Sequence, residues 1–300
     1  MLDDDNVLSL LVVILDTNPV WWGRNSTDNP EAEETKTFVE CVNQIIAFGN
    51  AHLTMNRKNK LAVIALQSDG SHFLYPLPEQ ELEAIQDENL NGKHETLVQM
   101  NVAVSRGIEN MLKDYQVPLE VDSLFAGAMG RALCYINMCE KNLSLGEKLS
   151  SRMLVIKGSE DNPLQYMNCM SAIFTAQKKN VTIDACILDN DSCLLQQACD
   201  ITKGIYLKVP HIGGLLQYLM WVFLPDPLHR ESLNLPPQME VDYRAACFCH
   251  RNLISIGYVC SVCLSIFCSF SPICATCQTT FKIHGPATLS RKKLKKVIGR

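Results

Sequence analysis

The chain has 300 residues, of which 47% are hydrophobic, and a formal net charge of −5. This composition is typical of a globular protein with one large and one small domain, and it excludes an intrinsically disordered chain. Residues 281–300 contain seven basic and no acidic residues, so residues 1–280 carry a net charge of −12. Such an acidic body is not typical of a domain that coats nucleic acid.

No apolar run has the length of a membrane span, and the residues at positions 3–5 are acidic where a secretory signal would be basic. We therefore expect neither membrane insertion nor export, and most of the 14 cysteines should stay reduced. Seven cysteines are scattered through residues 41–199, as small buried apolar residues would be, and seven crowd between Cys247 and Cys277.

Apolar runs alternate with helical patterns over the first 223 residues. The run at residues 8–15 (LSLLVVIL) is rich in β-branched residues and predicts a strand that is buried on both faces. Further strands are predicted at 61–66, 71–75 (a hairpin partner of 61–66), 153–156, 181–188 and 205–209, and helices at 35–48, 97–112, 124–139, 164–177, 194–202 and 215–223. This alternation predicts an α/β fold with a doubly wound, mostly parallel sheet of the Rossmann type.

The loop after the first strand lies at the carboxyl edge of the sheet, where ligands bind in such folds. Asp16 opens this loop, and here the chain resembles the von Willebrand A family, whose first strand ends in an Asp-x-Ser-x-Ser metal motif. Asn18 and Val20 replace the two serines, Ser123 could replace a threonine ligand, and the fourth strand runs into Lys157. Valine offers no oxygen to Mg²⁺ and a lysine repels it, so we expect Asp16 to bond to backbone N–H groups of its own turn.

Two adjacent tryptophans, Trp21 and Trp22, follow in the same loop. Tryptophan is over-represented among the residues that anchor protein interfaces. Alternatively, one or both rings pack beneath the loop as a small core. We expect one ring to be buried and the other to be available to a partner.

The sequence contains no dinucleotide-binding glycine motif, no phosphate loop and no nucleophile elbow. The histidines at positions 52, 72, 94, 211 and 229 are isolated in sequence. A cysteine–histidine pair that meets only in the fold stays open. We predict that the domain is not an enzyme.

Prolines mark the end of the α/β domain, because they remove backbone donors and stiffen an extended chain. We predict an α/β domain at residues 1–224, a proline-rich linker at 225–242, a cysteine-rich zinc module at 243–284 and a basic tail at 285–300.

Two Cys-x₂-Cys pairs, Cys260 with Cys263 and Cys274 with Cys277, are separated by ten residues. Four thiolates at this spacing can complete a tetrahedral shell, which suits Zn²⁺. The segment has too few apolar residues to fold by itself, and disulfides fit poorly because the number of clustered cysteines, seven, is odd. We therefore predict one zinc ion on these four residues.

The remaining donors, Cys247, Cys249, His250 and Cys268, leave a second metal site open. In a cross-brace module the first and third groups of ligands share one ion, which would join Cys247 and Cys249 with Cys268 and use His250 as the fourth donor. Adjacent Cys249 and His250 should point apart and share an ion only awkwardly. The sequence permits this second site without requiring it.

The basic tail has five basic residues among positions 291–296, which cannot join a core. Nuclear import or weak nucleic-acid contact would suit it. Between Cys247 and Cys277 only Arg251 is basic, which argues against phosphate contact by the cysteine cluster. Direct DNA contact is left open.

Three segments carry a closer resemblance: residues 56–64 (NRKNKLAVI), 188–202 (LDNDSCLLQQACDIT) and 241–250 (VDYRAACFCH). They look like the small von Willebrand A-like zinc subunit of the transcription and repair factor TFIIH. The resemblance implies a nuclear, non-catalytic scaffold subunit of the TFIIH core that acts in RNA polymerase II initiation and nucleotide excision repair. It also implies a direct partner, the second von Willebrand A-containing subunit, bound through that subunit's zinc domain.

A RING-type ubiquitin ligase with an α/β substrate-binding domain is the alternative interpretation. RING modules use eight ligands in cross-braced pairs, and the cysteine pattern after Cys263 is irregular by comparison. Two metal ions and activity that depends on a conjugating enzyme would favour the ligase.

Overall fold

The computed structural model describes residues 7–27, 38–77, 95–113, 123–144, 146–162, 165–230, 232–237, 241–250 and 253–281. The predicted basic tail lies outside these ranges. The chain divides into two compact units, Met1–Tyr243 and Arg244–Arg300, and each is described by itself. Among the described helices, none combines the length and the apolar character that crossing a bilayer requires.

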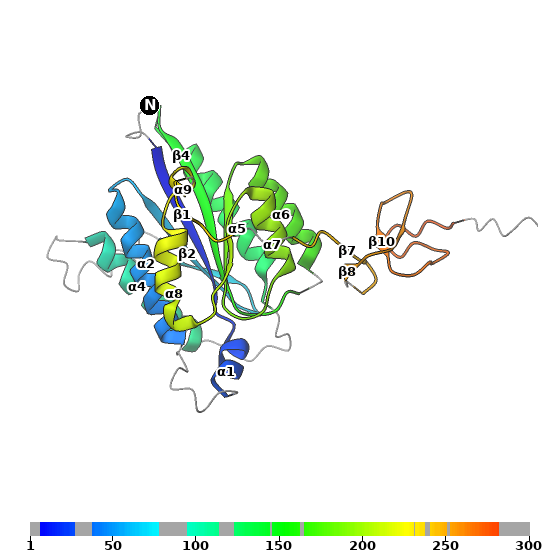
Figure 1. Ribbon diagram of the computed structural model, residues 1–300, viewed down its shortest axis with the longest axis horizontal. Coiled ribbons are helices and arrows are strands. Elements are labelled where there is room, and N and C mark those ends of the chain that lie inside the picture. Colours follow the sequence, from blue (N-terminus) through cyan, green and yellow to red (C-terminus); the bar gives the residue numbers. More distant parts are fainter. Residues whose placement is uncertain are drawn as a thin grey trace, which may run out of the picture. The chain divides into compact units, whose positions relative to one another are not determined.

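A six-stranded sheet with the order β3-β2-β1-β4-β5-β6 forms the centre of the first unit (Figure 1). All neighbouring strands are parallel except β3, which is antiparallel to β2 as the hairpin prediction requires. The strands are β1 (Val7–Asp16), β2 (Lys60–Leu66), β3 (Ser71–Tyr75), β4 (Lys148–Lys157), β5 (Thr182–Ile187) and β6 (Tyr206–Lys208). The predicted class, a doubly wound and mostly parallel α/β sheet, is confirmed.

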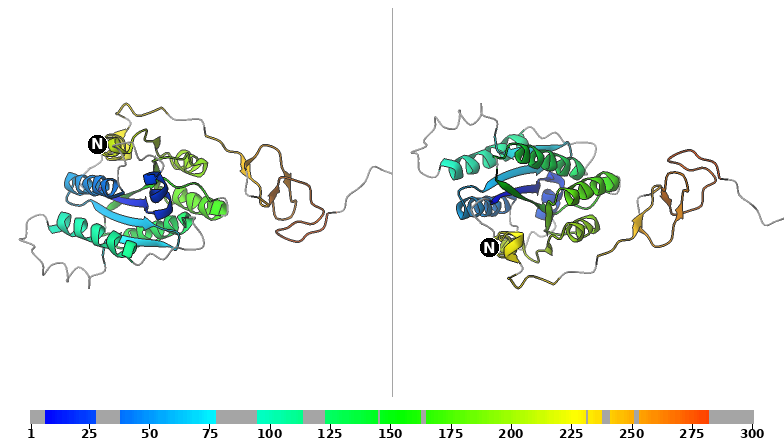
Figure 2. Two further views of the ribbon diagram at one scale, coloured as in Figure 1. Left: turned by 90° about the horizontal axis from the view of Figure 1, so that it is seen from below. Right: turned by 90° about the horizontal axis from the view of Figure 1, so that it is seen from above.

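Helices cover both faces of this sheet (Figure 2). They are α1 (Pro19–Thr27), α2 (Phe38–Met55), α4 (Glu95–Lys113), α5 (Phe125–Lys141), α6 (Tyr166–Lys178), α7 (Cys193–Thr202), α8 (Leu215–Tyr218) and α9 (Pro227–Arg230), with the short 3-10 helix η3 (Ile212–Gly214) before α8 and the π-helical turn η4 (Leu219–Phe223) after it. Alternate residues of β1 enter two separate cores, because successive side chains of a strand point to opposite faces. Leu10, Val12 and Ile14 pack with α5, α6 and α7, whereas Leu11, Val13 and Leu15 pack with α2, α4 and α8.

Helix α1 was not predicted, because residues 16–22 were expected to form a loop. Asn18 caps this helix, and its Oδ1 accepts a hydrogen bond from the backbone N–H of Val20 at 3.1 Å. Pro19 occupies the first helical position, where its missing N–H costs nothing. The helix therefore follows the first strand directly, at the carboxyl edge of the sheet (Figure 1).

A buried ion pair ties the end of the first unit to the sheet. Arg230 of α9 donates two hydrogen bonds, at 2.8 and 2.6 Å, to the carboxylate of Asp184 in β5. The two side chains are 7% and 1% exposed. Asp184 also accepts a hydrogen bond from the backbone N–H of Ile205 at 2.9 Å, next to the start of β6.

A second buried arginine, Arg152 of β4, holds the preceding turn. It donates hydrogen bonds of 2.7 to 2.8 Å to the backbone carbonyls of Phe223, Leu224 and Pro225. Its guanidinium also lies 3.5 Å from the carboxylate of Asp226. Residues 225–230, which were predicted to begin a linker, are therefore fastened to the α/β domain.

The last residues of the first unit contact α7. Gln197 donates a hydrogen bond of 2.6 Å to the backbone carbonyl of Asp242, and the hydroxyl of Tyr243 donates to the carboxylate of Asp200. Both ends of the predicted linker thus bind the α/β domain. The boundary at residue 224 stays a prediction.

The second unit has little secondary structure and a small core. Its strands are β7 (Ala245–Ala246), β8 (Leu253–Ile254), β9 (Tyr258–Val259) and β10 (Ile266–Phe267), which pair as β7 with β8 and β9 with β10. Its buried cluster consists of Cys260, Phe267 and Cys274. A core of this size does not stabilise a domain without metal ions or disulfides.

We expect Arg230→Met to lower the free energy of unfolding of the α/β domain by about 3–5 kcal/mol, because it leaves the Asp184 carboxylate buried without its cation. Urea unfolding followed by tryptophan fluorescence measures this domain alone, since all three tryptophans lie in the first unit. Lys208→Met is the matched control. It breaks a half-exposed pair with Asp191 and should cost less than about 1 kcal/mol. Equal effects of the two variants would contradict the structural role of Arg230.

His52 of α2 predicts a pH dependence of stability. Burial, with a smaller contribution from Arg152, lowers the pKa of His52 from 6.5 to about 4. Between these values the unfolded chain binds the proton and the folded chain does not. The free energy of unfolding should therefore fall by about 2 kcal/mol between pH 7 and pH 5.

His52→Gln should remove this part of the pH dependence, as measured by urea unfolding at the two pH values. His72→Gln, which changes a half-exposed histidine, is the control and should behave as the wild type does. An unchanged pH profile in His52→Gln would show that the neutral ring of His52 is not the cause.

Candidate metal centres and the carboxyl edge of the sheet

Cys260, Cys263, Cys274 and Cys277 meet in the second unit, with all four sulfur atoms within 4.8 Å of one another. The distance from Sγ of Cys260 to Sγ of Cys277 is 3.7 Å, and from Sγ of Cys263 to Sγ of Cys274 it is 3.6 Å. A tetrahedral ion with Zn–S bonds of about 2.3 Å requires sulfur atoms about 3.8 Å apart. The residues present therefore fit a zinc ion.

Each Cys-x₂-Cys pair folds into the same turn. After the first pair, the backbone N–H of Leu264 donates to the carbonyl of Cys260, and the N–H of Cys260 donates to the carbonyl of Ser265, both at 2.9 Å. Gln278 and Thr279 repeat these contacts after the second pair. Leu264 and Gln278 both have left-handed backbones, with φ of 60° and 58°. Two copies of one turn thus present the four thiols to a common point.

A hydroxyl group lies beside the last cysteine of each pair. The Oγ atom of Ser265 is 3.2 Å from the sulfur of Cys263, and the Oγ1 atom of Thr279 is 3.1 Å from the sulfur of Cys277. Hydrogen bonds from Ser265 lower the pKa of Cys263 to about 6, and hydrogen bonds from Thr279 lower the pKa of Cys277. The thiolate is the form that binds metal, so both hydroxyl groups favour metal binding.

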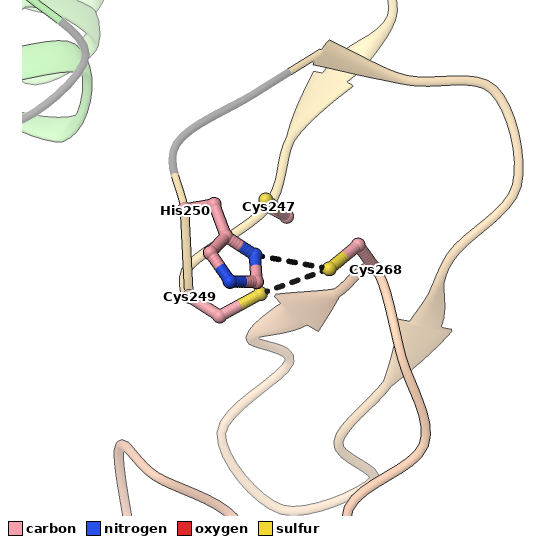
Figure 3. Close-up of side chains that lie close together, drawn as sticks. All are labelled: Cys247, Cys249, His250 and Cys268. Carbon is pink, nitrogen blue, oxygen red and sulfur yellow. Dashed lines mark hydrogen bonds between the residues drawn. The ribbon is translucent and has the colours of Figure 1, made fainter.

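A second cluster consists of Cys247, Cys249, His250 and Cys268, whose donor atoms also lie within 4.8 Å of one another (Figure 3). The sulfur of Cys268 is 3.2 Å from the sulfur of Cys249 and 3.2 Å from Nδ1 of His250. The expectation that Cys249 and His250 point apart is wrong, because the turn at residues 248–250 directs both side chains toward Cys268. All eight predicted donors are thus gathered into the two predicted sets.

The ligands of the two clusters alternate along the chain. Residues 247–250 belong to the second cluster, 260 and 263 to the first, 268 to the second, and 274 and 277 to the first. This is the cross-braced order in which two metal-binding groups interlock.

Asp16, at the carboxyl edge of the α/β domain, is 1% exposed and its carboxylate is saturated with hydrogen bonds. Oδ1 accepts from the backbone N–H of Asn18 at 3.2 Å and from the hydroxyl of Ser123 at 3.3 Å. Oδ2 accepts from the backbone N–H of Ser159 at 3.0 Å and from the Ser159 hydroxyl. The amine of Lys157 is 2.6 Å from Asp161, so a cation is already fixed at this edge. These donors occupy the oxygens that a metal would need.

The two tryptophans have different environments. Trp22 is 8% exposed, and its Nε1 donates to the backbone carbonyl of Asp16 at 3.0 Å. Trp21 is half-buried, and its ring crosses that of Trp22 edge-on at 4.7 Å. Its Nε1 lies 3.4 Å from the carboxylate of Asp189. Burial removes Trp22 from any partner in this conformation, and Trp21 keeps part of its surface at the edge.

Residues 8–278 match the family model described as Transcription factor Tfb4. The chain belongs to this family. The relative from Schizosaccharomyces pombe, general transcription and DNA repair factor IIH subunit tfb4, is 39% identical over 284 residues, which cover 94% of this chain and 92% of that protein. The Arabidopsis thaliana subunit TFB4 is 33% identical over 307 residues, with coverages of 96% and 95%.

The crystal structure of the TFIIH p34 N-terminal domain is similar to this chain. It superposes with a TM-score of 0.61 at 29% identity and covers 73% of this chain and 99% of that one. The relationship predicted from three short segments is therefore confirmed, and both Tfb4 relatives are subunits of a transcription and DNA repair factor.

We expect millimolar Mg²⁺ to leave the melting temperature of the protein unchanged, because the Asp16 carboxylate has no free position for a metal. Asp16→Ala should lower the free energy of unfolding by about 1–3 kcal/mol, since the donors from Ser123 and Ser159 lose their buried acceptor. Asp69→Ala, which removes an exposed acid, is the control. Stabilisation by Mg²⁺ in the wild type that disappears in Asp16→Ala would mean that the site binds metal.

Proposed function

We propose that this chain is a non-catalytic scaffold subunit of the TFIIH core, and that it acts in the nucleus in RNA polymerase II initiation and nucleotide excision repair. Membership of the Tfb4 family and the names of its relatives support this proposal. Its work is to hold other subunits through protein contacts, and no catalytic role is assigned to its residues.

The apolar surface of the second unit supports the proposal that this chain binds other proteins. Among the described residues of this unit, seven large apolar side chains are more than half exposed: Ile256, Tyr258, Val259, Val262, Leu264, Phe270 and Ile273. The sequence from 244 to 281 has no acidic residue and only two basic ones, at 244 and 251. Nucleic acid is bound by lysine and arginine, whereas an apolar, uncharged surface of this kind marks a protein interface.

A left-handed backbone at an exposed leucine supports the same interpretation. Leu264 has φ of 60°, and its side chain is 71% exposed. Glycine would adopt this conformation without the steric cost that a Cβ brings, about 1–2 kcal/mol. The side chain of Leu264 is not buried within the unit, so it does not stabilise the fold by burial. Contact with another subunit would bury it.

The zinc ion of the proposal is held by Cys260, Cys263, Cys274 and Cys277. When bound, it supplies the folding free energy that the small core lacks. The four thiols, two of them beside hydroxyl groups, position it. The interleaved order of the clusters is shared with RING-type modules, the alternative. The second cluster, however, takes three donors from Cys247–His250 and so differs from the paired ligands of a RING.

The direct partner in the proposal is the second von Willebrand A-containing subunit of TFIIH, bound through its zinc domain. Since the Asp16 carboxylate is saturated, capture of a partner carboxylate by a metal is not open to this domain. Recognition then depends on apolar contact and hydrogen bonds. Trp21 is an aromatic side chain at the carboxyl edge that keeps exposed surface.

Trp21→Ala should weaken binding of the partner's zinc domain by roughly 30-fold or more, because a tryptophan anchor contributes about 2 kcal/mol or more. Isothermal titration of the full chain measures the affinity, and a thermal melt of each variant measures stability. Trp22→Ala should mainly lower the melting temperature, since its ring is in the core.

Trp221→Ala is the matched control, because Trp221 is 77% exposed and lies in η4, which leads to α9 at the opposite end of the sheet from α1. It should bind as the wild type does. Normal affinity in Trp21→Ala would place the interface elsewhere on the domain, and a loss confined to Trp221→Ala would place it at η4.

A further inference from the structure

The donor atoms of the second cysteine cluster lie close enough together to surround a single metal ion. Three donors come from Cys247–His250 and the fourth, Cys268, comes from the residue after β10 (Figure 3). The sulfur atoms of Cys249 and Cys268 are 3.2 Å apart, which is less than the spacing of about 3.8 Å that zinc requires between two sulfur atoms. Nδ1 of His250 is also 3.2 Å from the sulfur of Cys268, closer to the spacing of about 3.5 Å that follows from Zn–S bonds of about 2.3 Å and Zn–N bonds of about 2.0 Å. Small side-chain rotations would open this space.

The backbone explains why these donors converge. The N–H of Phe248 donates to the carbonyl of Ile266 at 2.7 Å, which fixes this segment beside β10. The ring of Phe248 packs against the small core near Phe267, with ring centroids 6.5 Å apart. Cys247 and Cys249 flank Phe248, and the sulfur of Cys249 lies beside that of Cys268.

We propose that Cys247, Cys249, His250 and Cys268 bind a second zinc ion, and that the two ions clamp opposite ends of one hairpin. Three thiolates and an imidazole form a tetrahedral donor set that zinc accepts readily. Each thiol that binds releases its proton to the solvent, so the loaded site carries one negative charge. The proposal extends the zinc part of the proposed function and is tested separately from it.

The hairpin is β9 with β10. Val259 pairs with Ile266, and Tyr258 pairs with Phe267, in an antiparallel register. Cys260 directly follows β9, and Cys268 directly follows β10. Because antiparallel strands end at opposite ends of a hairpin, the first ion holds one end and the second ion holds the other. Strands of two residues are not stable alone, so each ion should support the site of the other.

The two sites differ in access to solvent. Cys249 and His250 are exposed, whereas Cys260 and Cys274 are buried. The second site should therefore release its ion to a chelator first, and removal of zinc should occur in two phases.

Native mass spectrometry of the full chain, purified with zinc under reducing conditions, tests the proposal. We expect two ions in the wild type, one in Cys268→Ser and one in His250→Ala. Cys134→Ser, which changes an exposed cysteine outside both clusters, is the control for the first variant and should keep two ions. His229→Ala is the control for the second and should also keep two.

Replacement of zinc by Co²⁺ gives an independent measurement. The absorption bands of the second site should change in His250→Cys, which converts three sulfurs and one nitrogen to four sulfurs, while two ions are kept. This variant retains the donor number and therefore remains informative if Cys268→Ser fails to fold.

The outcomes separate the two zinc sites. One ion in the wild type that persists in Cys268→Ser and is lost in Cys263→Ser would overturn the second site and leave the first intact. A disulfide between Cys249 and Cys268 with a single ion would overturn it as well. No ion in the reduced wild type would overturn the zinc part of the proposed function together with this inference.

Discussion

The carboxylate of Asp184 imposes the constraint on which the α/β domain depends. It sits in a strand that has no other charged residue and is 1% exposed, so it requires a cation and hydrogen-bond donors. Arg230 supplies the cation from α9, and the backbone of Ile205 supplies a donor beside β6. One buried charge therefore joins the fifth strand, the edge strand and the last helix of the domain. The chain cannot leave the sheet before residue 230 without leaving this charge unpaired in an apolar interior.

Three of the strands were predicted closely from the sequence, whereas the run at 153–156 gave only the second half of β4 (Lys148–Lys157). The runs at 8–15, 61–66 and 71–75 became β1, β2 and β3 with changes of one residue at most at either end. For β1 and β2 the reason is burial on both faces, which leaves few polar residues in the run. Helix α1 was missed because its signal is a cap, Asn18 before Pro19, and not an apolar periodicity. The pairing of Arg230 with Asp184 joins residues 46 positions apart, and no local pattern predicts it. The charged residue Asp184 within the apolar run 181–188 was the one local sign that a buried cation would be needed there.

The cysteine spacing predicted the four residues of the first cluster, and the cross-brace order offered the second set without requiring it; the side chains of each set lie together in the structure. The spacing could not decide how Cys249 and His250 are oriented, since adjacent side chains diverge in an extended chain and converge only in a turn.

The α/β domain differs from the second unit in the source of its stability. In the α/β domain a large core makes a metal unnecessary for folding, and the Asp16 carboxylate accepts its hydrogen bonds from serine hydroxyls and backbone N–H groups. In the second unit the core is too small, and metal coordination is the remaining source of stability.

Gly158, the residue after β4, has an effect beyond its own size. A Cβ atom there would overlap the ring of Trp21. The position of that ring over the sheet edge therefore depends on the absence of a side chain in a different loop. An alanine at position 158 would displace the ring of Trp21 and so change the surface that this edge presents. Residue 158 is itself buried and is not available to a partner. The shape of this edge therefore depends on two residues, Trp21 and Gly158, that lie 137 positions apart in the sequence.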